Sequence, residues 1–228
     1  MPTDLSYKPS FLLAGLAIFG INIICWLAAL FIAPADALQG EYYRIIYVHV
    51  PSALSAFGAA AALGIFSVIT LARHQVRWVN PARASVEVGL LFTVLTLVSG
   101  SIWGRPVWGT WWTWDARLTT TLLLALMNAG YLLLFLSIDD SRVRAKVCAV
   151  FGIMIFLDVP IIYKSVSWWR TLHQPPTLLR SGGSTMDPDM KTILLSCCFS
   201  MLVFSWWLIA ARARNLNALT ELESRVRQ

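Results

Sequence analysis

The residues of this sequence best suited to bind a ligand are two histidines. His49 stands in YRIIYVHVPSA and His173 in SWWRTLHQPP, and a proline follows each of them two residues later. Neutral imidazole is a common ligand of metal ions and of porphyrin iron. Because Pro51 suits the first turn of a helix, we expect His49 to lie at a helix mouth. The third histidine, His74, lies in RHQVRWVNPAR and receives no role.

A tryptophan-rich segment, WGRPVWGTWWTWDARLT at residues 103–119, is the most informative stretch of the chain. One interpretation is an aromatic belt, in which indoles lie at the lipid headgroup level. The other is a ligand platform, because Gly104, Pro106 and Gly109 predict a non-helical surface that presents flat rings to a flat molecule such as a porphyrin. Five of the eleven tryptophans fall within twelve residues here: Trp103, Trp108, Trp111, Trp112 and Trp114.

The elements that position these residues are predicted to be transmembrane helices. Hydrophobic residues make up 57% of the 228, charged residues only 13%, and the mean hydropathy is +0.66. A bilayer core requires about 20 apolar helical residues, and six segments qualify. The sequence therefore predicts an all-α integral membrane protein, a single domain over residues 1–228. Its spans are residues 11–32, 49–71, 85–102, 118–138, 147–163 and 192–211.

The distribution of Lys and Arg predicts the orientation. With the N-terminus inside, eleven of the eighteen basic residues fall in inner regions, so both termini are predicted to be cytoplasmic. The first span is too long for a cleaved signal peptide and is predicted to be retained. Both candidate histidines and residues 103–119 then lie on the outer face. The net charge of +6 is scattered among loops and forms no stripe typical of nucleic-acid binding.

The outer connections hold more arginine than is usual for that side. One explanation is a ligand with carboxylates, such as the propionates of heme, and the other is ordinary anchoring at the interface. Arg44, Arg105 and Arg117 are the candidate propionate partners. Asp115 directly precedes the fourth span and is predicted to cap that helix.

Heme explains the two histidines better than zinc does. Zinc would require further Cys, His or carboxylate ligands near the histidines. The four cysteines lie in or beside apolar segments, and none forms a C-x-x-C pair or a C-x-x-C-H heme attachment site. We therefore predict noncovalent heme with two imidazole ligands, and this chain is not itself a c-type cytochrome.

At these residues the chain resembles the CcmC family, the heme-handling membrane proteins of bacterial cytochrome c maturation. Residues 103–119 resemble the family's WWD signature, and YVHVPSA and WWRTLHQP resemble its two histidine segments. The resemblance covers essentially the whole chain. It implies that His49 and His173 are the axial ligands of heme b, and that the tryptophan-rich platform comprises Trp103, Trp108, Trp111, Trp112, Trp114 and Asp115.

The resemblance also implies a location and partners. The location is the bacterial inner membrane, with the heme site on its periplasmic face. The partners are the ATPase and membrane subunits of an ABC transporter (CcmA, CcmB), a small membrane helix protein (CcmD) and a periplasmic heme chaperone (CcmE). No G-x-x-x-x-G-K-[ST] loop occurs, so energy must come from a partner. We lean towards a heme presenter without catalytic residues, although the family is sometimes described as a heme lyase component.

The main alternative is a b-type heme subunit of a membrane electron-transfer complex. Such hemes lie between helices inside the bilayer, whereas these histidines are predicted at the outer surface. A transporter or channel would require charged residues along the spans, and only Glu87 and Asp158 are available. Glu87 is interpreted as structural, and the sequence leaves the role of Asp158 open.

Overall fold

The computed structural model describes residues 8–174 and 186–226, and within them the chain is entirely helical apart from turns and one isolated bridge. Six of the described helices are long and apolar enough to cross a membrane, which confirms the predicted fold class. The elements are α1 (Pro9–Phe31), η1 (Glu41–Ile45), α2 (Ile46–Arg73), η2 (Val76–Trp78), α3 (Val79–Trp108), α4 (Ala116–Ser137), α5 (Ser141–Trp168) and α6 (Pro188–Val226).

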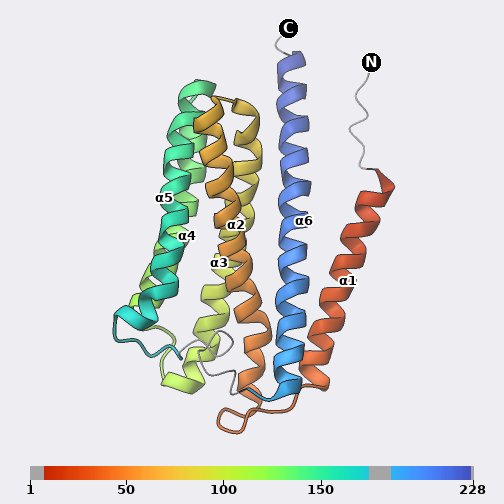
Figure 1. The fold of residues 1–228 in the computed structure, drawn as a ribbon, viewed down its shortest axis with the longest axis vertical. Helices are drawn as coiled ribbons and strands as arrows, with labels where there is room; N and C mark the ends of the chain where they lie inside the picture. The colour runs from red at the N-terminus through yellow and green to blue at the C-terminus, as the bar shows by residue number, and fades with distance from the viewer. Residues whose placement is uncertain (1–7, 175–185, 227–228) are drawn as a thin grey trace.

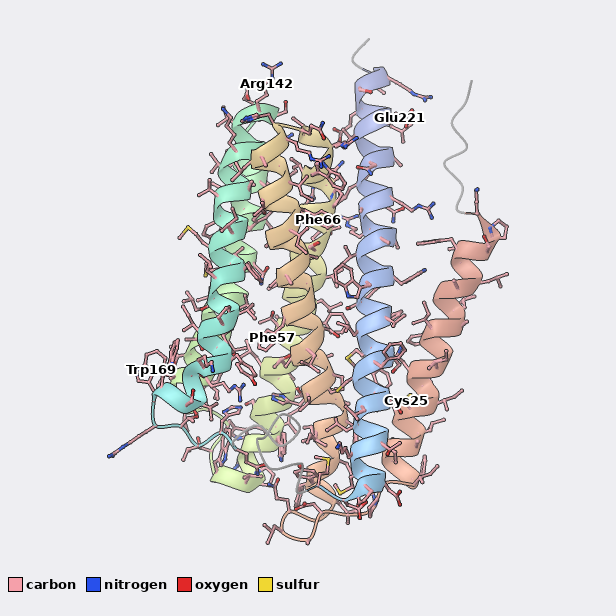
Figure 2. The ribbon with its side chains drawn as sticks, in the orientation of Figure 1. Cys25, Phe57, Phe66, Arg142, Trp169 and Glu221 are labelled. Atoms are coloured by element: carbon pink, nitrogen blue, oxygen red, sulfur yellow. The ribbon has the colours of Figure 1, made fainter. Side chains whose placement is uncertain are left out.

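Helices α2 to α5 form a bundle, α6 packs on α2 and α3, and α1 packs mainly on α6 (Figure 1). The start of α1 and the end of α6 lie at one end of the molecule (Figure 1). The opposite end carries η1, the end of α3 and the end of α5 (Figure 1). Figure 2 shows Arg142 and Glu221 at the first end, and Trp169 towards the other.

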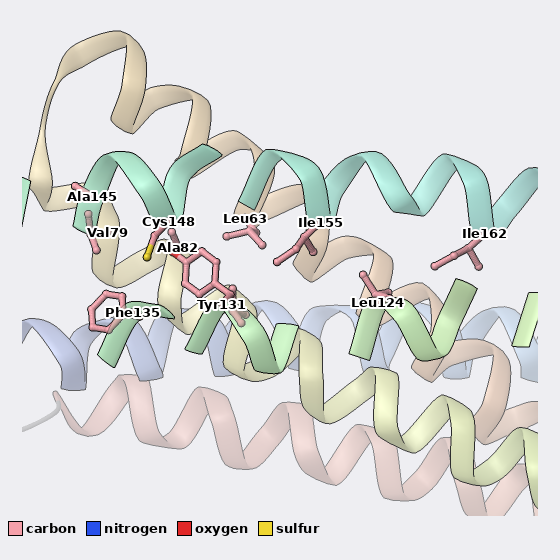
Figure 3. Packing of buried hydrophobic residues seen from close by; sticks show 11 residues of the cluster. Leu63, Val79, Ala82, Leu124, Tyr131, Phe135, Ala145, Cys148, Ile155 and Ile162 are labelled. Atoms are coloured by element: carbon pink, nitrogen blue, oxygen red, sulfur yellow. The ribbon is translucent and has the colours of Figure 1, made fainter. Parts of the chain in front are cut away.

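Buried apolar side chains join the four helices of the bundle. Leu63 of α2, Tyr131 of α4 and Ile155 of α5 are at most 1% exposed and lie in one cluster (Figure 3). Because lipid replaces water around a bundle, close packing rather than the hydrophobic effect holds such helices together. A small residue at the α2–α5 contact permits this, since a Cβ on Gly152 would lie 2.4 Å from Ser67 Oγ.

Two charged residues within the spans have different surroundings. Glu87 of α3 accepts hydrogen bonds from Arg83, at 2.9 Å, and from Arg212 of α6. It therefore ties α3 to α6, in agreement with a structural role. Asp158 of α5 is only 5% exposed, and its Oδ2 has no hydrogen-bond partner in the described part of the chain.

The structure corrects the expected end of the third span. Helix α3 continues through Trp103 to Trp108, so the first third of the tryptophan-rich segment is helical and not a loop. Pro106 lies inside the helix near its end, where its missing N–H removes a single backbone hydrogen bond. The helix ends at Gly109, which has a φ of 77° in the left-handed region that favours glycine.

The expected position of His49 at a helix mouth is also wrong. The short helix η1 runs directly into α2, which begins at Ile46, so His49 lies one turn inside the helix. Pro51 is likewise interior and not in the first turn. The last helix extends to Val226, well beyond the apolar residues that predicted it.

A prediction follows from the contact of α1 with α6. A Cβ on Gly15 would lie 2.1 Å from the Trp207 ring, and that ring donates a hydrogen bond to the Phe11 carbonyl at 3.2 Å. The rigid indole cannot yield without losing this bond. We expect Gly15→Ala to lower the free energy of unfolding of the protein in detergent by about 1–3 kcal/mol, the usual cost of overpacking. A lower melting temperature would show this loss.

The matched control is Gly20→Ala on the same helix, where a Cβ would meet nothing within 4 Å. There the substitution should leave the melting temperature unchanged or raise it, because alanine favours helix more than glycine does. Equal melting temperatures for the two variants would contradict the close α1–α6 contact.

Candidate ligand-binding site

A cavity of about 540 Å³ lies among α2 to α6 towards the end of the bundle that carries η1. This volume is within the range of small-molecule sites. Its lining is mostly apolar, with a small number of polar side chains. His49, His173, Arg117 and three tryptophans all line it, so the cavity unites residues that are far apart in the sequence.

His49 reaches the cavity from α2 and is held against α3. Its Nδ1 lies 3.1 Å from Ser99 Oγ, within hydrogen-bonding distance. The Trp103 ring packs edge-on to the imidazole, with centroids 5.7 Å apart and an interplanar angle of 75°. The Ser99 contact occupies Nδ1 and leaves Nε2 available to a ligand.

His173 reaches the same cavity from the segment that follows α5. Its ring lies 5.1 Å from the Trp108 ring, and its Nδ1 lies 3.7 Å from Asp115 Oδ2. The backbone N–H of His173 donates to the Thr171 hydroxyl oxygen at 3.0 Å. Thr171 in turn donates its proton to Asp115 Oδ2 at 2.7 Å. Asp115 and Thr171 therefore fasten the histidine segment to the start of α4.

Asp115 is the predicted cap of α4, and the structure confirms that role. Its Oδ1 accepts the Leu118 N–H at 2.9 Å. Burial alone would raise the pKa of this carboxyl. The His173 ring and hydrogen bonds from the Leu118 N–H and the Thr171 hydroxyl outweigh burial and hold the pKa of Asp115 well below its usual range. A fixed negative charge therefore stands beside His173.

The tryptophans divide into two groups. Trp103, Trp108 and Trp112 line the cavity. Trp111 is 57% exposed and Trp114 is 77% exposed, and neither lines it. Trp114 packs edge-on to Trp112, with ring centroids 5.5 Å apart, so its exposed ring lies next to a residue of the cavity wall. The sequence predicts all five in one platform, and the structure brings three of them to the cavity.

The three candidate arginines also separate. Arg117, the second residue of α4, lines the cavity. Arg44 donates to the carbonyl oxygens of Ala29, at 2.6 Å, and Ala33, at 2.8 Å, and it pairs with Glu41, so it secures the end of α1. Neither Arg44 nor Arg105 lines the cavity.

The guanidinium of Arg105 donates to the Gly109 carbonyl at the end of its own helix. Lys191 of α6 is a second cation in the cavity wall, and nothing in the sequence pattern assigns it to the site. Ser99 was missed entirely. No three His, Cys, Asp or Glu side chains gather in residues 8–174 and 186–226, so the zinc alternative gains no ligand set there.

Comparison with known proteins decides the family. The family model described as heme exporter protein C matches residues 4–228. The chain belongs to the CcmC family. The CcmC resemblance drawn from the histidine and tryptophan segments is thereby confirmed. Heme exporter protein C of Escherichia coli K12 is 40% identical over 197 residues, which cover 86% of this chain and 79% of the relative.

Two further relatives agree with this assignment. Heme exporter protein C of Haemophilus influenzae is 38% identical over 208 residues, covering 91% of this chain and 83% of the relative. A putative cytochrome c biosynthesis ccmC-like mitochondrial protein of Marchantia polymorpha is 38% identical over 179 residues, which cover 78% of this chain and 75% of the relative. CcmC relatives thus match most of the chain in both bacteria and a plant.

Proposed function

We propose that this protein binds heme b between His49 and His173 and presents it to an acceptor during cytochrome c maturation. The observation that carries the proposal is that two imidazoles, from α2 and from the segment after α5, line one largely apolar cavity. Two imidazoles complete the axial coordination of porphyrin iron. Membership in the CcmC family and the names of the relatives support heme as the cargo.

The remaining lining suits the other parts of heme. Tryptophan rings offer flat apolar contacts to a macrocycle, and Trp112 Nε1 is buried without a hydrogen-bond partner in the described residues. Arg117 and Lys191 offer cations to the propionates. The residues present therefore fit the cargo at its iron, its ring and its carboxylates.

Orientation and partners belong to the same proposal. The distribution of basic residues supports an orientation with both termini in the cytoplasm, in which the cavity faces the periplasm of the inner membrane. The exposed Trp111 and Trp114 beside the cavity provide a surface for a CcmE-type heme chaperone. The chain carries no nucleotide-binding loop, so CcmA and CcmB subunits of an ABC transporter supply the energy, with CcmD as a further membrane partner.

Deletion of the gene in its own host tests this function against the electron-transfer alternative. We expect c-type cytochromes to lose covalent heme and accumulate as apoproteins, while b-type cytochromes keep normal spectra. Heme staining of membrane proteins after denaturing electrophoresis measures this difference. Mature c-type cytochromes together with the loss of one electron-transfer step would instead support a b-type heme subunit and overturn the proposal.

A further inference from the structure

Helix α3 holds the His49 ring through two consecutive residues, Ser99 and Gly100. Ser99 Oγ lies 3.1 Å from His49 Nδ1, and Ser99 is only 5% exposed. A Cβ on Gly100 would lie 2.9 Å from His49 Cε1, so only glycine leaves room for the ring at this point. The imidazole is therefore seated on α3 at a position set by a hydroxyl and a missing side chain.

The direction of the hydrogen bond follows from the neighbours of Ser99. A serine hydroxyl has one proton and two acceptor lone pairs. Its proton has a partner within the helix, because Oγ lies 2.7 Å from the Leu95 carbonyl oxygen and 3.2 Å from that of Thr96. The hydroxyl oxygen is then available to His49 only as an acceptor, so Nδ1 is the donor.

The acceptor at Ser99 fixes the tautomer of His49. Because Nδ1 donates to Ser99 Oγ, Nδ1 carries the proton of the neutral ring. In neutral imidazole the other nitrogen, Nε2, then carries the lone pair that a metal requires.

We propose that Ser99 is a positioning residue that fixes the orientation and tautomer of His49, so that Nε2 binds the heme iron. The inference rests on the proposed function, because it concerns the same ligand. Hydrogen bonds to the distal nitrogen of a metal-bound histidine fix its ring and raise its basicity. Ser99 thus acts through His49 and does not touch the heme itself.

The test compares heme binding and reduction potential in full-length protein purified in detergent. In Ser99→Ala we expect heme affinity to fall about tenfold, the lower end of the range for such outer contacts. A loss of imidazole basicity destabilises ferric iron more than ferrous iron, so the midpoint potential should rise. If the affinity for ferric heme falls tenfold more than the affinity for ferrous heme, the midpoint potential rises by about 59 mV for this one-electron couple.

Two further variants separate hydrogen bonding from packing. Ser99→Thr keeps the hydroxyl and should restore the wild-type potential, whereas Ser99→Val has the shape of threonine without the acceptor and should resemble Ser99→Ala. The matched control is Ser85→Ala on the same helix. Ser85 is 1% exposed and donates to the Pro81 carbonyl at 2.9 Å, but it has no histidine partner. Its loss should leave affinity and potential at wild-type values.

Two outcomes would overturn the role of Ser99. One is a wild-type potential and affinity in Ser99→Ala, while His49→Ala still loses the bis-imidazole spectrum. The other is an equal shift in Ser99→Ala and Ser85→Ala, which would indicate a general effect of losing a buried hydroxyl. Failure of the proposed function would give a different result, because the wild-type protein itself would then lack the bis-imidazole heme spectrum.

Discussion

Replacement of either His49 or His173 by alanine is expected to abolish the six-coordinate, bis-imidazole optical spectrum of heme in the purified protein. The two side chains line one cavity from different elements, so neither can replace the other. Loss of a direct iron ligand should cost more than the roughly 10–100-fold that loss of an outer contact costs in metal affinity. The heme iron of each variant should become five-coordinate, or the heme should be absent after purification.

The matched control is His74→Asn at the opposite end of α2, where the residue ends the helix with a φ of 51°. Asparagine tolerates this left-handed conformation, so the control should keep both its fold and the wild-type spectrum. Addition of free imidazole should restore a six-coordinate spectrum to His49→Ala, because the truncation leaves space beside the iron. Unchanged heme in both alanine variants would exclude these histidines as the ligands.

The six spans could be predicted because length and apolar composition alone determine whether a segment crosses a bilayer. Helix ends could not. Gly104 and Pro106 interrupt helices in water, yet in α3 Gly104 allows Trp108 to pack closely, with its ring 2.9 Å from where a Cβ would stand. Pro106 lies near the end of α3, where its missing N–H removes a single backbone hydrogen bond. The helix therefore continues past both residues, although their helix propensity predicts an earlier end.

Part of the site could also be predicted, since histidines, tryptophans and arginines are rare enough in membrane segments to attract attention. The pattern does not reveal which of them share a cavity. Arg44 lies five residues before His49, but its hydrogen bonds go to two carbonyl oxygens at the end of α1. Only the folded position of α1 shows this.

Ser99 carried no signal in the sequence. Serine in an apolar helix usually donates to the carbonyl four residues earlier, and Ser99 does this with Leu95. Its second role depends on His49, which is 50 residues away in the chain. Residues proposed to position a ligand therefore require the three-dimensional structure, whereas candidate ligands can be recognised by residue type.

Arg117 is the residue from which we expect the second large effect. It lines the cavity at the second position of α4, where a positive charge opposes the helix dipole. That cost is offset when carboxylates lie nearby, and Asp115 supplies one from two residues earlier in the chain. A heme propionate would supply another. We therefore expect Arg117→Met to weaken heme binding by about 10–100-fold, the equivalent of a charge-assisted hydrogen bond of about 1.5–3 kcal/mol.

The decisive measurement compares heme with heme dimethyl ester, in which both propionates are uncharged. Wild-type protein should prefer heme, and Arg117→Met should lose most of that preference, because the variant can no longer distinguish carboxylate from ester. Arg105→Met is the matched control, since Arg105 bonds the Gly109 carbonyl and does not line the cavity. If Arg117→Met weakens heme and its ester equally, the arginine supports the cavity wall and does not pair with a propionate. Among the described residues, Lys191 is then the remaining cation in the lining.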